Sequence, residues 1–166
     1  MVDRMTLSHL DAAGRPRMVD VTDKAATPRT AVAEGAIRMS PEAFQLVANG
    51  DVAKGNVLAV SEIAGTFAAK RTAELIPLCH PLGLDHVEIE ATLDAKLPGV
   101  RVRAAAKTVG RTGVEMEALT AVSVALLTVY DMMKAADRSM EIQGVHLVEK
   151  TGGRRGDWKR NAAGPR

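Results

Sequence analysis

The segments VEIEATLD at residues 87–94 and VRVRA at 100–104 decide the fold of this chain. In both, apolar side chains alternate with charged or polar ones, which is the period of a strand that buries one face. Pro98-Gly99 between them supplies a turn. The pattern predicts a β-hairpin with one solvated face, on which acids of the first strand can pair with arginines of the second.

Helix signals lie on both sides of this hairpin. Ser40-Pro41 predicts a helix start, because serine caps and proline suits the first helical position. The expected elements besides the hairpin are a strand near 33–39, helices from Ser40 to Gly50, from Gly55 to about Leu75 and from about Val114 to Ala136, and a strand near 145–149. This βαββαβ order predicts an α+β, ferredoxin-like fold, with an antiparallel sheet packed on helices.

The 166 residues have the length of one domain. We expect a flexible arm at residues 1–17, a folded domain at 18–157 and a flexible tail at 158–166, because both ends lack a core-forming pattern. A net charge of +2 and an aromatic fraction of 2% argue against a nucleic-acid-binding protein. In particular, an RNA-binding sheet would stack bases on aromatic side chains, and the hairpin carries none.

Cellular location follows from what the sequence lacks. The most apolar run, Leu119 to Val129, is too short and too polar for a membrane span. The single cysteine, Cys79, forms neither an internal disulfide nor a Cys-rich zinc site, which fits a reducing compartment. No secretory signal pattern is seen, so we expect a cytoplasmic protein without a membrane partner.

The expected helix at 114–136 is apolar on every side, so it is buried all round. Two explanations are open. The preceding helix can form a third layer within the chain, or a second subunit can cover the helix. We favour the subunit interface and therefore an oligomer.

Charged groups cluster around this helix and before an earlier one. Asp131 and Lys134 are three apart, so they are neighbours on one helix face. They are either functional or a solvated salt bridge. Lys54, in a turn before a helix, is suited to bind phosphate, although loop lysines are usually only solvated.

Pro77-Leu78-Cys79-His80-Pro81 is a rigid loop that carries a thiol and an imidazole. Histidine suits proton transfer near neutral pH. A structural role for Cys79 is the better expectation, and His86 and His146 are expected to be sheet residues rather than metal ligands.

Glu115 and Glu117 open the long helix, where acids complement the helix dipole. Glu117 and Asp131 are 14 residues apart, which is about 21 Å along a helix. Either the substrate is long or two chains share each site. In the second case, Lys54 and Asp131 of one pocket can come from different chains.

Two long runs are similar to the signatures of the MoaC family: LIPLCHPL at 75–82 and TGVEMEALT at 112–120. Shorter matches extend the resemblance from about Met18 to Asp157. They are MVDV at 18–21, AAKRT at 68–72, YDM at 130–132 with Lys134, and Gly152-Gly153 before Gly156-Asp157.

The resemblance implies a lyase of molybdenum cofactor (molybdopterin) biosynthesis. This family converts (8S)-3′,8-cyclo-7,8-dihydroguanosine 5′-triphosphate to cyclic pyranopterin monophosphate and releases diphosphate. It implies a ferredoxin-like fold, a homohexamer built as a trimer of dimers, and sites at chain interfaces. No cofactor and no metal are expected.

The resemblance also implies roles for individual residues. Asp131 is the acid/base, and Lys54, Lys134 and His80 complete the catalytic set. The implied substrate-binding residues are Leu78, Cys79, His80, Glu115, Met116, Glu117, Arg29 and Lys150. This intact set argues against a catalytically silent nucleotide sensor.

The chain departs from the family pattern in three places. Asn56 stands where Asp is common, Ser61-Glu62 replaces a common Ala-Arg pair, and Arg111 stands where Lys is frequent. The first two leave the electrostatics of the Lys54 turn open.

Overall fold

The computed structural model describes residues 14–154 and 156–161. Within them the element order is strand, three helices, two strands, a long helix and two strands. The elements are β1 (Thr27–Arg38), α1 (Pro41–Asn49), α2 (Val57–Lys70), α3 (Thr72–Leu75), β2 (His86–Asp94), β3 (Gly99–Gly110), α4 (Glu115–Met133), β4 (Glu141–Thr151) and β5 (Trp158–Lys159). Most of the arm expected at 1–17, together with Arg155 and the end of the tail at 162–166, lies outside the described residues.

The described strands form one antiparallel sheet in the order β2-β3-β1-β4-β5. The predicted hairpin is confirmed as β2 and β3, with Asp94 paired to Gly99 at the turn. Arg101 binds Asp94 across the hairpin at 2.5 Å. Arg103 instead faces Glu34 of β1 at 3.7 Å, because β1 is the other neighbour of β3.

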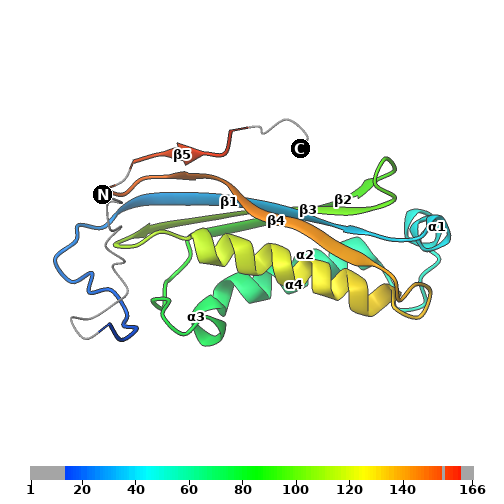
Figure 1. The fold of residues 1–166 in the computed structure, drawn as a ribbon, viewed down its shortest axis with the longest axis horizontal. Helices are drawn as coiled ribbons and strands as arrows, with labels where there is room; N and C mark the ends of the chain where they lie inside the picture. Colours follow the sequence, from blue (N-terminus) through cyan, green and yellow to red (C-terminus); the bar gives the residue numbers. More distant parts are fainter. Residues whose placement is uncertain (1–13, 155, 162–166) are drawn as a thin grey trace.

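The long helices α2 and α4 cover one face of this sheet (Figure 1). Their axes approach closely because Gly65 of α2 has no side chain. A Cβ there would lie 3.1 Å from the Ala121 carbonyl oxygen of α4. Gly35 does the same for β1, where a Cβ would lie 3.0 Å from side-chain atoms of Val122 and Leu126. Small residues therefore let the helices and sheet make a core with few aromatics.

Helix α4 is the centre of this core. Ala118, Ala121, Ala125 and Val129 are completely buried. The covering layer within the chain is therefore present as α2. By length and composition α4 could also cross a membrane, but 56% of it is buried in the molecule, which is typical of a core helix.

Several boundaries expected from the sequence differ from those observed. The helix expected from Gly55 to Leu75 is divided at Arg71 into α2 and α3. The strands expected near 33–39 and 145–149 are longer, at 27–38 and 141–151. The parts that were not predicted, TPRTAV at 27–32 and EIQG at 141–144, do not show a regular alternation of large apolar and polar side chains. The expected tail begins with β5, which pairs with Glu149 and Lys150 of β4.

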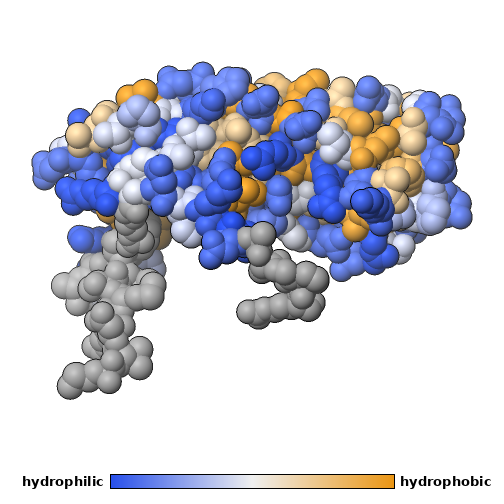
Figure 2. Space-filling model, turned by 90° about the horizontal axis from the view of Figure 1, so that it is seen from above, coloured by the Kyte–Doolittle hydropathy of each residue, from blue (hydrophilic) through white to orange (hydrophobic). Residues whose placement is uncertain are grey.

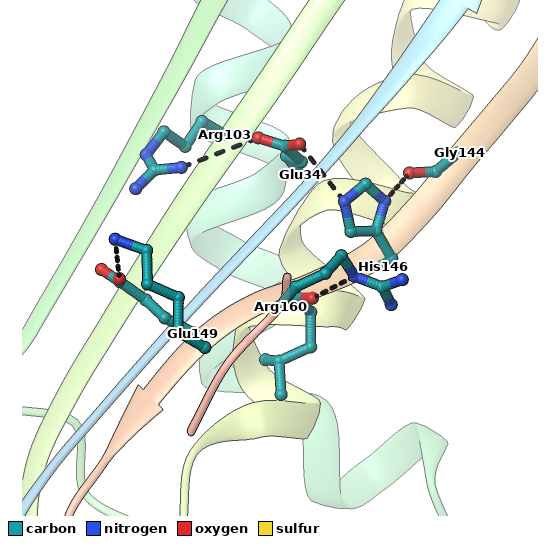
Figure 3. A network of polar contacts seen from close by, with 8 residues as sticks. Glu34, Arg103, Gly144, His146, Glu149 and Arg160 are labelled. Carbon is teal, nitrogen blue, oxygen red and sulfur yellow. Dashed lines mark hydrogen bonds and ion pairs between the residues drawn. The ribbon is translucent and has the colours of Figure 1, made fainter. Parts of the chain in front are cut away.

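The sheet face away from the helices carries mainly hydrophilic side chains between small apolar areas (Figure 2). Glu34 lies there between Arg103 and His146, 3.2 Å from the His146 Nε2 (Figure 3). Glu149 lies near them (Figure 3) and is paired with Lys159 at 3.6 Å. Arg103 and Lys159 are each paired with an acid, and Arg160 Nε donates to the Leu147 carbonyl oxygen. The network therefore does not form a strongly basic surface for a polyanion.

Candidate active site

A cavity of about 1250 Å³ opens where α4 begins. Its walls come from the segment before β1, the loop after α3, the turn before α4 and the end of β4 (Figure 1). It gathers every residue that the resemblance implied for substrate binding: Arg29, Leu78, Cys79, His80, Glu115, Met116, Glu117 and Lys150. These residues are far apart in sequence, and the fold brings them together.

His80 is held by the backbone of another segment. Its Nε2 lies 2.7 Å from the Val19 carbonyl oxygen. Because a carbonyl oxygen only accepts, Nε2 must carry the proton of this hydrogen bond. Val19 itself lines the cavity, so the bond joins two of its walls.

Glu117 is the buried acid of the cavity, with 4% of its surface exposed. Burial raises its pKa above the ordinary value of 4.5, and the neighbouring Glu115 carboxylate raises it further, against a lowering by its own backbone N–H. Burial also raises the pKa of the Cys79 thiol, and Glu117 adds to that effect. The neutral thiol is therefore favoured, which agrees with a role for Cys79 other than nucleophile.

Arg29 is positioned by groups around it. Its Nε donates to the Gly110 carbonyl oxygen at 3.3 Å. The Gly152-Gly153 turn leaves room for its side chain, because a Cβ on Gly153 would collide with Nη1 of Arg29. Gly153 also has a φ of +86°, which disfavours any other residue. This glycine pair therefore allows the guanidinium to reach the cavity.

An acid and a base of the cavity are placed beside the turn before α4. Lys150 Nζ lies 3.9 Å from Glu115 Oε1. Gly113 makes room for the Glu115 carboxylate, which a Cβ at that position would overlap.

A second cluster lies at the other end of α4. Asp131 accepts from Lys134 at 2.8 Å and from Lys54 at 3.2 Å. Hydrogen bonds from Lys134 and then Lys54 lower the pKa of Asp131, and Asp131 raises the pKa of Lys134. All three side chains are about half exposed. In this state the group is an ionised carboxylate held between two ammonium groups.

The structure therefore divides the expected site residues into two groups. His80 lies with the cavity, while Lys54, Asp131 and Lys134 lie about 21 Å away along α4, counted from Glu117 to Asp131. The expectation that Lys54 and Asp131 come from different chains is wrong, because they form an ion pair within one chain.

Further polar groups line the cavity that the sequence did not single out as site residues. Among them are Asp23, Lys24, Thr27, Arg111 and Arg154. Thr27 has a buried hydroxyl oxygen without a hydrogen-bond partner among the described residues. The signals that could have identified this group are the position of Arg111 beside one signature run and of Asp23 and Lys24 just after MVDV. Across residues 14–154 and 156–161, no three His, Cys, Asp or Glu side chains are grouped to hold a metal.

The structure explains two of the residues that depart from the family pattern, Asn56 and Glu62. Asn56 is the N-cap of α2, and its side chain accepts from Ala59 N at 3.0 Å, as an aspartate would. Glu62 accepts from the backbone N–H of Ala91 in edge strand β2 at 2.9 Å. Its carboxylate is therefore used at the sheet edge, and not at the Lys54 turn.

Comparison with known proteins now adds to this geometry. The sequence model of the MoaC family matches residues 18–153. This range contains every residue that lines the cavity except Arg154, and it also contains all three residues of the second cluster. The chain belongs to the MoaC family. The match begins at Met18, one residue before Val19, whose carbonyl oxygen binds His80. Both segments that this hydrogen bond joins therefore fall within the MoaC match.

Several bacterial proteins are similar to this chain over nearly its whole length. A cyclic pyranopterin monophosphate synthase of Methylobacterium sp. (strain 4-46) is 60% identical over 158 residues, covering 95% of this chain and 99% of the relative. One of Chloroflexus aggregans is 56% identical over 154 residues, covering 93% of each chain. One of Brucella ovis is 57% identical over 152 residues, covering 92% of each chain.

Proposed function

We propose that this protein is a cyclic pyranopterin monophosphate synthase. It is a lyase that converts (8S)-3′,8-cyclo-7,8-dihydroguanosine 5′-triphosphate to cyclic pyranopterin monophosphate with release of diphosphate, an early step of molybdenum cofactor biosynthesis. Nearly full-length identity of 56–60% to relatives of that name carries the proposal. The large cavity lined by acids, bases and an imidazole supports it.

The basic groups of the cavity suit a triphosphate. Arg29, Arg111, Lys150 and Arg154 come from three different parts of the chain and line one space. Charge-assisted hydrogen bonds from such groups bind phosphate oxygens strongly and stabilise the diphosphate that leaves.

The proton transfers need groups of both clusters. His80 and Glu117 can exchange protons at one end of the substrate. Asp131, as a carboxylate, can accept a proton and orient the two lysines, of which either can return one. Since the clusters of one chain lie at opposite ends of α4, we infer that each pocket combines the cavity of one chain with the Lys54–Asp131–Lys134 cluster of a neighbour.

Such a pocket requires an oligomer, and we infer the homohexamer, a trimer of dimers. Exposed apolar side chains on the helical layer support an interface. Ile63 and Phe67 of α2 are 58% and 59% exposed, and Leu127 of α4 is 56% exposed. Ile63 and Phe67 are four residues apart and so share one face of α2, and exposed large apolar side chains on a helical layer are typical of a surface that a partner covers.

The remaining expectations belong to the same proposal. The strand order and the helices on one face support a ferredoxin-like fold of four long strands. The family match over 18–153 supports a functional domain at about 18–157. We propose a cytoplasmic enzyme whose site residues act without a cofactor.

The deciding experiment is incubation of the purified protein with the cyclised GTP intermediate. We expect release of diphosphate and formation of cyclic pyranopterin monophosphate, detected by mass spectrometry. A Glu42→Gln variant, altered at an exposed position of the first turn of α1 that belongs to neither cluster, is the matched control and should keep full activity. Absence of diphosphate release from well-folded wild-type protein would overturn the proposal.

A further inference from the structure

The contact between His80 and the backbone of Val19 determines which atom of the imidazole is available for chemistry. A neutral imidazole has one N–H and one unprotonated nitrogen. The 2.7 Å bond to a carbonyl places the proton on Nε2. Within residues 14–154 and 156–161, no protein group forms a hydrogen bond with the other nitrogen, Nδ1.

His146 shows how different this arrangement is. Its Nδ1 lies 2.5 Å from the Gly144 carbonyl oxygen and its Nε2 lies 3.2 Å from Glu34 (Figure 3). Both nitrogens of His146 face acceptors, so that ring is held at both ends. His80 is held at one end only, and it lines the large cavity.

The segment that accepts this hydrogen bond is itself a wall of the cavity. Val19, Val21, Asp23 and Lys24 all line the space. Local bonds fold the segment: Thr22 N donates to Asp20 at 2.9 Å, and Lys24 N donates to the Val21 carbonyl at 3.0 Å. These bonds are internal to the segment, whereas the His80 bond joins it to the loop after α3.

We propose that His80 is fixed as its Nε2–H tautomer by the Val19 carbonyl, so that Nδ1 is the nitrogen that exchanges protons with the substrate. The same bond holds the wall at residues 19–24 over the cavity. In the proton-transfer step, the lone pair of Nδ1 takes a proton from the substrate to give the imidazolium, and the same N–H later returns it. The assignment of substrate chemistry to Nδ1 rests on the proposed function, while the tautomer does not.

The first test is nitrogen NMR of the whole protein with ¹⁵N-labelled histidine, at about pH 8.5, where ordinary imidazoles are neutral. The His80 signals are identified by their loss in His80→Gln, and His86→Gln serves as the control for the assignment. We expect a protonated-type Nε2 and an unprotonated-type Nδ1 for His80. The reverse pattern, or a rapid average of the two tautomers, would overturn the proposal.

The second test separates the two ring nitrogens by substitution. In His80→Gln, the new amide can place an N–H near the position of Nε2 and so keep the bond to Val19, but it has no basic nitrogen. His80→Gln should therefore lower kcat by about 10²–10⁴ with KM little changed. His80→Asn introduces a side chain too short to reach Val19, so it should lower kcat as much and raise KM as well.

His86→Gln, on an exposed position of β2, should leave both constants unchanged. Near wild-type kcat in His80→Gln would contradict the role of Nδ1, and equal KM values for the two His80 variants would contradict the role of the Val19 bond. Because the NMR result needs no turnover, it decides the tautomer even if the proposed reaction fails.

Discussion

Lys54 Nζ donates to the Asp131 carbonyl oxygen at 2.8 Å and to its carboxylate at 3.2 Å, within one chain. The turn before α2 and the last turn of α4 are thereby joined. Lys134 completes the group on the other carboxylate oxygen. On the proposed assembly these three residues enter one pocket together, whereas His80 lies in the cavity at the other end of α4.

Subunit mixing tests this division. In a two-fold dimer with two shared pockets, a Lys54→Ala chain paired with a His80→Ala chain has one intact pocket and one doubly defective pocket. With random pairing of equal amounts, half of the dimers are mixed, so we expect about one quarter of wild-type activity. Co-expressed chains with two different affinity tags allow the mixed species to be isolated and assayed.

The matched control is a mixture of Lys54→Ala with Asp131→Ala. Both changes fall in the same cluster, so every pocket of the mixed dimer stays defective and no activity should return. Recovery in this control, or none in the first mixture despite verified exchange, would contradict the shared pocket.

Asp131→Asn should separate catalysis from stability. Asparagine has nearly the same shape, but it cannot take up and return a proton. We expect turnover to fall by about 10²–10⁴ with little change in substrate binding or melting temperature, because the ion pairs are exposed. Steady-state kinetics and thermal melts measure both effects.

Lys134→Ala is the companion variant. It should weaken turnover and substrate binding together, because it removes a cation and a possible base. If Asp131→Asn turned over the substrate at a near wild-type rate, Asp131 would be only part of a surface salt bridge.

The raised pKa of Glu117 implies that stability depends on pH. Its pKa is raised in the folded protein by burial, so the folded state binds more protons than the unfolded state above the ordinary value of 4.5. The free energy of unfolding should therefore fall as pH rises from 4.5 through the raised pKa, and stay lower above it. Glu117→Gln removes this titration.

The measurement compares melting temperatures of wild type and Glu117→Gln from pH 4 to 8. We expect the variant to gain stability relative to wild type as pH rises, and to lose activity. Glu115→Gln, a less buried change, is the control and should show a smaller effect. A difference in melting temperature that is independent of pH would exclude a raised pKa at Glu117.

The hydrogen bond from Ala91 N–H to Glu62 should contribute to the free energy of unfolding. Glu62→Ala removes the acceptor of the buried Ala91 N–H, which should cost roughly 1–3 kcal/mol of unfolding free energy. Glu62→Gln keeps an oxygen acceptor and should cost clearly less. Chemical denaturation measures both, and equal losses would show that the hydrogen bond does not contribute.

The sequence predicted well what depends on local pattern. The hairpin followed from strict alternation, and the start of α1 followed from Ser40 and Pro41, where Ser40 accepts from Ala43 N as a cap. The ends of β1 and β4 could not be predicted, because TPRTAV at 27–32 and EIQG at 141–144 do not alternate large apolar with polar side chains.

The site residues could likewise be predicted only in part. Motif resemblance identified the residues of both clusters, but which of them meet depends on contacts between distant segments. No spacing rule places Lys54 on Asp131, 77 residues away. The same holds for Val19 and His80, which are 61 apart. The space that Gly153 leaves for Arg29 is likewise visible only in the fold.

The cavity and the Lys54–Asp131–Lys134 cluster lie at opposite ends of α4, and the shared pocket proposed above gives this separation a genetic consequence. On the proposed assembly, a chain damaged at only one end still completes one of the two pockets when it pairs with a normal chain. A chain damaged at both ends completes neither, so each such chain also silences its normal partner. Two changes that are each recessive alone would therefore become dominant when they occur in the same copy of the gene.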